Sequence, residues 1–169
     1  EEVFITISNV SIVVSEPRLL ILHAQTPVAT FYACSIHCPH SKNMQHAKMW
    51  YDRVRPKMGV LCGKCFIAMC DANTELVEGF VNETVGGVGL NKGGKLCEQF
   101  LDIVSRAQGK VLSSYPENLK DGEKPITFIK GGTETTDDYL FASADVSAVH
   151  DSVHVDERFD MMNEDDDHV

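Results

Sequence analysis

Two closely spaced pairs of cysteines constrain this chain more than any other feature of its sequence. The first pair has the spacing Cys34-x3-Cys38, and the second has the spacing Cys62-x2-Cys65. Two such pairs can converge on one tetrahedral Zn²⁺, which binds four thiolates and then has no open position for water. The sequence therefore predicts a structural zinc site formed by Cys34, Cys38, Cys62 and Cys65.

Histidines around the first pair leave the set of zinc ligands open. His37 and His40 flank Cys38, and His46 follows a few residues later, so each of the three is an alternative ligand. Two other interpretations stay open beside the zinc site. In the first, the cysteines are reduced thiols buried in the core. In the second, they form disulfides in a secreted chain.

Length and composition indicate one globular domain. A chain of 169 residues with 43% hydrophobic content can bury a substantial core. No apolar run approaches the length of a membrane helix, so we expect no membrane partner. The chain starts at Glu1 without an initiator methionine or a signal peptide, and we expect a fragment or a processed form.

The net charge of −10 is unevenly distributed. Residues 134–169 contain twelve acidic side chains and one basic side chain, so this segment alone carries −11. Between Ser41 and Lys64 there are six basic residues and one acidic residue. Because a phosphate backbone responds to local charge, this basic segment favours contact with nucleic acid despite the acidic total.

The order of expected elements predicts a mostly β fold. One helix is expected over 95–109, where apolar residues have helical spacing and Gly109 ends the pattern. Residues 34–70 have no clear period and are predicted to be an irregular zinc-binding insert within a barrel domain of residues 1–149, followed by an acidic tail at 150–169. Strands are expected at 3–7, 10–14, 19–22, 28–33, 74–85, 126–130 and 139–149. This order predicts a small closed β-barrel with one main helix.

Several phrases of the sequence resemble one known family. Phe31-Tyr32-Ala33-Cys34 leads into the first cysteine pair, and Cys62-Gly63-Lys64-Cys65 forms the second. A glycine turn and the segment from Cys97 to Gly109 then follow. Together these resemble the zinc-containing C-terminal OB-fold of the replication protein A large subunit and of its telomeric and telomerase-associated relatives. The resemblance implies a five-stranded OB-fold barrel with an inserted zinc ribbon and one main α-helix.

The same resemblance implies binding of single-stranded DNA in replication, repair or telomere maintenance. Bases would stack on aromatic rings, at about 1–3 kcal/mol per base, while basic side chains contact phosphates. The expected partners are single-stranded DNA and other subunits of a replication protein A-like or telomeric complex, and the expected location is the nucleus. The residues proposed for DNA contact are Trp50, Tyr51, Arg53, Arg55, Lys57, Lys92 and Lys130.

The sequence also bears on two other classes of function. A protein-interaction OB module with little DNA contact is the alternative, because OB barrels also bind proteins and the chain is acidic overall. An enzyme is not expected. A zinc deaminase needs a His-x-Glu phrase, which the sequence lacks, and no set of nucleophile and base is evident.

Overall fold

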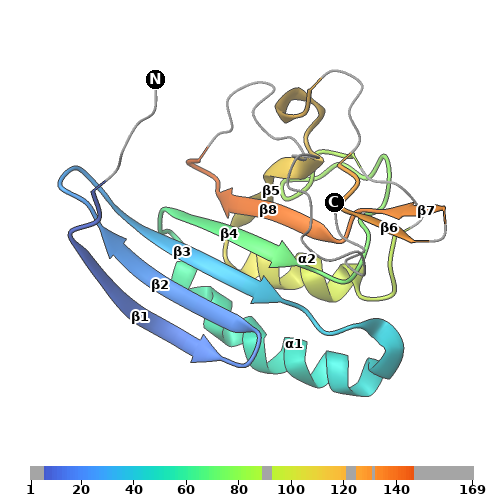
Figure 1. Cartoon of the computed structure of the whole chain (residues 1–169), viewed down its shortest axis with the longest axis horizontal. Helices are drawn as coiled ribbons and strands as arrows, with labels where there is room; N and C mark the ends of the chain where they lie inside the picture. Colours follow the sequence, from blue (N-terminus) through green and yellow to red (C-terminus); the bar gives the residue numbers. More distant parts are fainter. Residues whose placement is uncertain (1–5, 89–92, 121–124, 131, 147–169) are drawn as a thin grey trace.

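Six strands form one mixed sheet in the order β1-β2-β3-β4-β8-β5 (Figure 1). The computed structural model describes residues 6–88, 93–120, 125–130 and 132–146. Neighbouring strands are antiparallel except β3 and β4, which are parallel. A separate hairpin joins β6 and β7. The strands are β1 (Asn9–Glu16), β2 (Leu19–Gln25), β3 (Thr30–His37), β4 (Phe66–Asp71), β5 (Gly109–Val111), β6 (Phe128–Lys130), β7 (Thr133–Thr135) and β8 (Asp138–Ser143).

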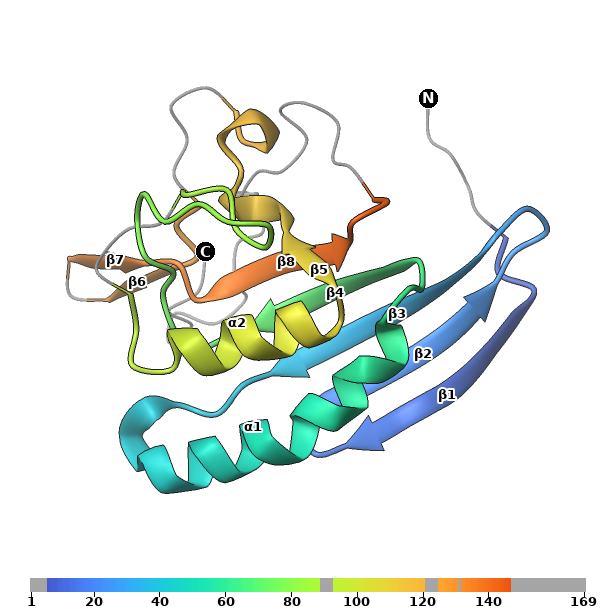
Figure 2. The same cartoon turned by 180° about the vertical axis from the view of Figure 1, so that it is seen from behind.

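Two α-helices, α1 (Met44–Met58) and α2 (Cys97–Arg106), cover one face of this sheet (Figures 1 and 2). Parallel strands need a long crossover connection, and α1 lies in the connection from β3 to β4. Short 3₁₀ turns complete the described elements: η1 (Ser41–Asn43), η2 (Gly59–Leu61), η3 (Leu112–Ser114) and η4 (Pro116–Asn118). The sheet therefore has one face covered by helices and one outward face.

The sequence forms α1 because apolar residues recur on one side of it. Ala47, Trp50, Tyr51, Val54 and Met58 are all buried, and their spacing places them on one helical face. The Asn43 side chain caps the helix by accepting a hydrogen bond from the backbone N–H of His46 at 3.0 Å. The crossover is thus held against the sheet by ordinary core packing.

The second helix supplies the aromatic centre of the core. Phe100, Ile103 and Val104 are fully buried at one side of α2. The Phe100 ring stacks on Tyr139 with a centroid distance of 5.3 Å and meets Phe141 edge-on at 6.3 Å. Because both partners come from β8, these contacts fasten α2 to the strand next to the edge strand β5.

The predicted OB-fold barrel is wrong. The sheet is open, because β1 and β5 lie at its two edges and do not pair with each other. Residues 34–70 are no irregular insert, since they contain the end of β3, the helix α1 and the strand β4. The structure therefore shows a mixed α/β fold in which the parallel pair β3–β4 is central.

Several predictions of individual strands and of one helix are confirmed. The strands expected at 10–14, 19–22 and 28–33 correspond to β1, β2 and β3, and the helix expected over 95–109 is α2. The long strand expected at 74–85 is absent; this segment contains only isolated bridge residues, at Val77, Val81 and Val85. The acidic tail at 150–169, Lys92 and part of the strand expected at 3–7 lie outside the described residues.

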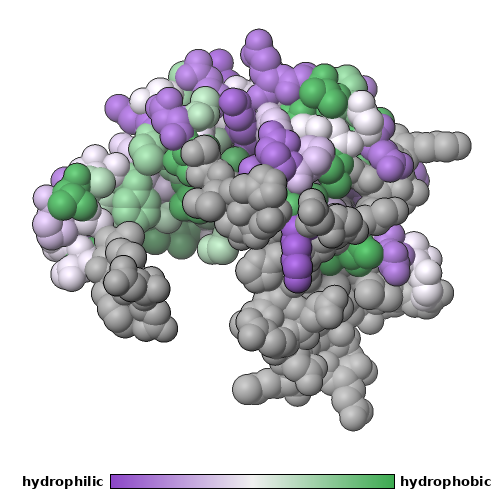
Figure 3. Space-filling view, turned by 90° about the horizontal axis from the view of Figure 1, so that it is seen from above, coloured by the Kyte–Doolittle hydropathy of each residue, from purple (hydrophilic) through white to green (hydrophobic). Residues whose placement is uncertain are grey.

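The outward face of the sheet is apolar along much of its length. Ile12 on β1 and Met69 on β4 are each 68% exposed, and Val10, Leu20 and Ile67 are also exposed. A sheet with one face in water normally alternates apolar and polar residues, whereas strands buried on both faces are apolar throughout. Seen from above, the surface of the molecule also carries apolar side chains among hydrophilic ones, on a side that is not the sheet face alone (Figure 3). The outward face therefore has the composition of a covered surface.

Replacing both Ile12 and Met69 with lysine should reduce the binding of a hydrophobic dye such as bis-ANS. We expect the free energy of unfolding to change by about 0.5 kcal/mol or less per site, because neither side chain lies in the core. Dye fluorescence and urea denaturation measure the two quantities. The control Ile21→Lys alters the fully buried face of β2 and should unfold the chain. Unchanged dye binding in the double variant would contradict this description of the outward face.

Candidate functional site

Three polar side chains form a row across adjacent strands at one end of the sheet. His37 is the last residue of β3, Asp71 is the last residue of β4, and Asp138 is the first residue of β8. The strand register pairs His37 with Asp71 and Asp71 with Asp138. Their sequence neighbours in the strands are buried under the helices, so the three side chains point to the outward face.

Both oxygens of the Asp71 carboxylate lie close to a polar partner. Oδ2 lies 3.2 Å from Nε2 of His37, and Oδ1 accepts the backbone N–H of Asn73 at 3.1 Å. Asn73 has a φ of 50°, a left-handed conformation that asparagine adopts more readily than most residues. Its side-chain amide donates to the carbonyl of Cys38 at 2.8 Å. The loop after β4 is therefore tied to the end of β3 beside Asp71.

Acidic side chains concentrate around the start of β8. Burial raises the pKa of Asp137, and the nearby carboxylates of Glu75, Asp138 and Asp71 raise it further. The hydrogen bond from the Thr135 hydroxyl, at 3.2 Å, acts in the opposite direction. Carboxylates placed directly opposite each other on paired strands destabilise a sheet. Such a departure from a stable arrangement is expected at functional sites.

A cavity of about 510 Å³ opens beside this row. The row provides its charged side, and the remaining wall is largely apolar or neutral. That wall includes Ser35, Met69, Ser113, Leu119, Pro125, Thr127 and Leu140. The site thus combines two carboxylates and an imidazole with an adjoining hollow that can receive an uncharged group of a substrate.

This arrangement supports two kinds of chemistry. Asp71 and Asp138 supply oxygen ligands of the type that Mg²⁺ prefers. His37 has a side chain that is 54% exposed and is oriented by Asp71, so it is placed to exchange a proton with a bound molecule. Within the described residues, no three His, Cys, Asp or Glu side chains converge closely enough to enclose a metal by themselves.

The predicted structural zinc site is wrong. Cys62 and Cys65 are exposed and precede β4, whereas Cys34 and Cys38 are buried and lie in β3 and just after it. Because β3 and β4 are parallel, Cys38 lies at the opposite end of the pair from Cys65. Cys38 Sγ instead lies 3.7 Å from Cys70 Sγ. Among the described residues the alternative ligands His37, His40 and His46 form no metal-binding group with these cysteines either.

The residues predicted to contact DNA lie in several different environments. Trp50 and Tyr51 are 4% and 3% exposed and pack in the core, where Trp50 Nε1 donates to the Pro17 carbonyl at 3.3 Å. Arg55 pairs with Asp102 on α2 at 2.8 Å. Lys130 is in β6, and Lys92 is outside the described residues. A role of these residues in DNA contact stays a prediction.

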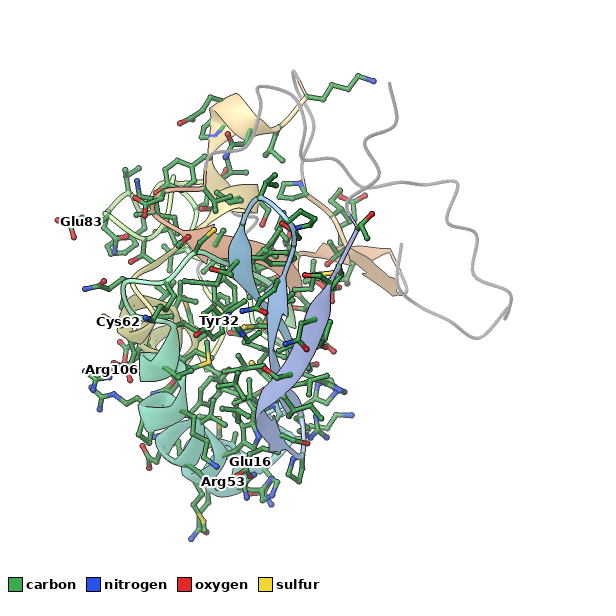
Figure 4. The ribbon with its side chains drawn as sticks, turned by 90° about the vertical axis from the view of Figure 1, so that its left-hand side faces the viewer. Glu16, Tyr32, Arg53, Cys62, Glu83 and Arg106 are labelled. Atoms are coloured by element: carbon green, nitrogen blue, oxygen red, sulfur yellow. The ribbon has the colours of Figure 1, made fainter. Side chains whose placement is uncertain are left out.

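The other two basic residues of this set meet one acidic residue. Arg53 Nε lies 3.8 Å from Glu16 Oε2, and the Lys57 ammonium pairs with Glu16 Oε1. The view with side chains as sticks shows Glu16 and Arg53 together at one end of the molecule, away from Cys62 (Figure 4). Part of the basic charge of α1 is thus neutralised by the end of β1.

The Glu16→Gln variant should show a smaller loss of stability in acid than the unchanged chain. The hydrogen bond from Lys57 and the charges of Lys57 and Arg53 lower the pKa of Glu16 below 4.5, although burial opposes them. The contribution of the ionised Glu16 side chain to stability is therefore present above pH 4.5. It is lost as the pH falls through the lowered pKa of this residue. Urea denaturation at neutral pH and at about pH 3 measures the difference. If Glu16→Gln loses as much stability in acid as the unchanged chain, the prediction is wrong. Glu117→Gln, at an exposed position, is the control.

Comparison with known proteins identifies the fold but no close relative. No protein-family model matches the sequence, and no curated protein is significantly similar to it. The AP endonuclease LMAP from Leishmania major superposes with a TM-score of 0.52 and 13% identity, covering 76% of this chain and 46% of that one. The endonuclease domain of TRAS1, a telomere-specific non-LTR retrotransposon, gives 0.46 with 18% identity, covering 76% and 51%. Truncated Caenorhabditis elegans TDP2 gives 0.44 with 12% identity, covering 85% and 55%.

The match to LMAP shows the fold, and the chain spans about half the length of the structures that it matches. The resemblance to the replication protein A OB-fold is therefore wrong, as is the single-stranded DNA-binding OB domain inferred from it. The alternative of an OB interaction module and the expected replication or telomere complex lose their basis for the same reason. The expectation that the chain is no enzyme is contradicted as well, since an AP endonuclease has this fold. No helix in the described part of the chain is long and apolar enough to cross a membrane.

The sequence contains a signal for Asp71 and Asp138, which were not among the predicted site residues. Asp71-Ala72-Asn73 directly follows the apolar run of β4, and Asp137-Asp138 directly precedes the apolar run of β8. Polar residues at the ends of strands are often functional, because a rigid sheet positions them precisely.

Proposed function

We propose that this chain forms part of a phosphodiester-cleaving enzyme that acts on DNA with the help of Mg²⁺. The observation that carries the proposal is the row of His37, Asp71 and Asp138 at one end of the sheet, in a fold shared with an AP endonuclease. The zinc proposed from the cysteines has no place in this function, because the site offers oxygen ligands instead of thiolates.

The donor atoms of the site fit Mg²⁺. This ion usually keeps several waters and binds one or two carboxylates together with substrate phosphates, so it needs no enclosing set of protein ligands. Asp71 and Asp138, paired in register on β4 and β8, are the residues that would hold it. When bound, the ion would supply positive charge for a phosphate and increase the acidity of a bound water.

The residues of the chain itself would orient the substrate and move a proton. Nε2 of His37 is engaged with Asp71 at 3.2 Å, which leaves Nδ1 as the nitrogen for proton exchange with the substrate. Asn73 fixes the Asp71 carboxylate through its backbone N–H. The apolar wall formed by Met69, Leu119 and Leu140 offers a surface for the uncharged part of a nucleotide.

Metal binding and DNA cleavage by the purified chain together test this proposal. Mn²⁺, used as a paramagnetic substitute for Mg²⁺, should bind as measured by electron paramagnetic resonance. Cleavage should be measured on supercoiled plasmid and on a duplex oligonucleotide with one tetrahydrofuran abasic analogue, with MgCl₂ or with EDTA. We expect Mn²⁺ binding, together with cleavage that requires the metal. Absence of both would overturn the proposal, and Mn²⁺ binding without cleavage would overturn its catalytic part.

A further inference from the structure

We propose that the hydroxyl group of Tyr139 is a positioning group that keeps the loop after Asp71 and the segment before Asp138 at a fixed separation. This inference rests on the proposed function, since it concerns the two carboxylates assigned to Mg²⁺. It adds a residue that the row on the outward face does not contain.

The Tyr139 hydroxyl connects two segments that are distant in the sequence. Its oxygen accepts the backbone N–H of Leu76 at 3.0 Å, in the loop that follows Asp71. It also lies 2.6 Å from the carbonyl oxygen of Thr136 and 3.2 Å from that of Thr74. A hydroxyl has one hydrogen to donate, and the shorter distance assigns it mainly to Thr136. One side chain therefore ties both segments together.

The ring of Tyr139 is itself held firmly. It is 5% exposed, and it stacks on Phe100 of α2 with an angle of 29° between the rings. A rigid ring with a fixed hydroxyl can transmit its position to the loops that it binds.

Tyr139 is among the residues that line the cavity, but its ring packs against Phe100 of α2. It alternates with Asp138 along β8, so its ring points to the face covered by helices while the carboxylate points outward. Its influence on the site must pass through the backbone of 74–76 and of Thr136. The expected effect of removing its hydroxyl is therefore on the spacing of the carboxylates.

The variant Tyr139→Phe tests this inference, because it keeps the ring and removes only the hydroxyl. Mn²⁺ titration of the purified chain by electron paramagnetic resonance should show a dissociation constant raised by about 10-fold or more, as is typical when a group that orients a metal ligand is lost. Ser143→Ala is the matched control. It removes another buried hydroxyl on β8, one that accepts the N–H of Phe66 at 3.3 Å at the opposite end of the strand. Its Mn²⁺ affinity should equal that of the unchanged chain.

The outcomes separate this inference from the proposed function. If the unchanged chain and Asp71→Asn both fail to bind Mn²⁺, the metal site itself is wrong and the inference falls with it. If the unchanged chain binds Mn²⁺ and Tyr139→Phe binds it equally well, only the positioning role is overturned. Circular dichroism confirms that each variant is folded. Should Tyr139→Phe be unfolded in buffer, the same titration in trimethylamine N-oxide, which favours the compact state, gives the comparison.

Discussion

Replacing Asp71 with asparagine should reduce metal-dependent DNA cleavage by at least about 100-fold. A metal ion that neutralises charge on a phosphate contributes several kcal/mol to the reaction, and each 1.36 kcal/mol corresponds to a factor of about ten. Asparagine keeps the size of Asp71 and one oxygen that can accept from Asn73. It removes the negative charge, however, and with it one of the two carboxylates for Mg²⁺. Initial rates on the abasic duplex at several Mg²⁺ concentrations measure the loss.

The stability of the Asp71→Asn variant should not fall with its activity. Asp71 lies opposite Asp138 in the strand pair, so neutralising one of them relieves repulsion between like charges. An unchanged or higher unfolding temperature combined with lost cleavage is the signature of a functional carboxylate. Asp52→Asn on the exposed side of α1 is the control and should leave both quantities unchanged. Lost activity accompanied by a large loss of stability would instead indicate a structural role for Asp71.

Truncating Phe100 to alanine should destabilise the chain by about 3–5 kcal/mol, which is much of the 5–15 kcal/mol that stabilises a typical domain. The Phe100 side chain is fully buried and contacts both Tyr139 and Phe141. Its removal leaves a cavity between α2 and β8 that rigid neighbours cannot fill. Urea denaturation followed by circular dichroism measures the free energy of unfolding.

The same substitution at Phe80 provides the control for this prediction. Phe80 is 47% exposed in the loop after β4, and Phe80→Ala should change the free energy of unfolding by only about 0.5 kcal/mol. Similar losses at Phe80 and Phe100 would contradict the placement of the core between α2 and the sheet.

Local patterns in the sequence were sufficient to predict part of the fold. The first and third strands are rich in β-branched and aromatic residues, and the second is rich in leucine. The helix α2 has a clear apolar stripe that ends near Gly109. The same kind of stripe marks α1, at Ala47, Trp50, Val54 and Met58, but the cysteines on either side favoured a zinc ribbon instead. The segment 74–85 has Val and Thr in partial alternation, yet only isolated bridges form there. Strand propensity depends strongly on what the strand can pack against, and the sequence alone does not contain that information.

The candidate site was harder to predict than the fold. His37, Asp71 and Asp138 come from three separate parts of the chain, and only the order of strands in the sheet brings them together. The choice between an open sheet and a closed barrel therefore determined whether the row could be recognised. Cys34, Cys38, Cys62 and Cys65 were close in sequence, which made them conspicuous, but the parallel pairing of β3 and β4 separates the two pairs.

The position of β8 in the sheet affects how the chain can fold during synthesis. β8 is the last described strand of the main sheet, yet it lies between β4 and β5. Until residues 138–143 leave the ribosome, β4 has a partner on one side only, and its other edge can pair with another chain. Strand pairing between such distant segments is slow. A nascent chain of this protein therefore passes through a stage in which its central strand is open to intermolecular association.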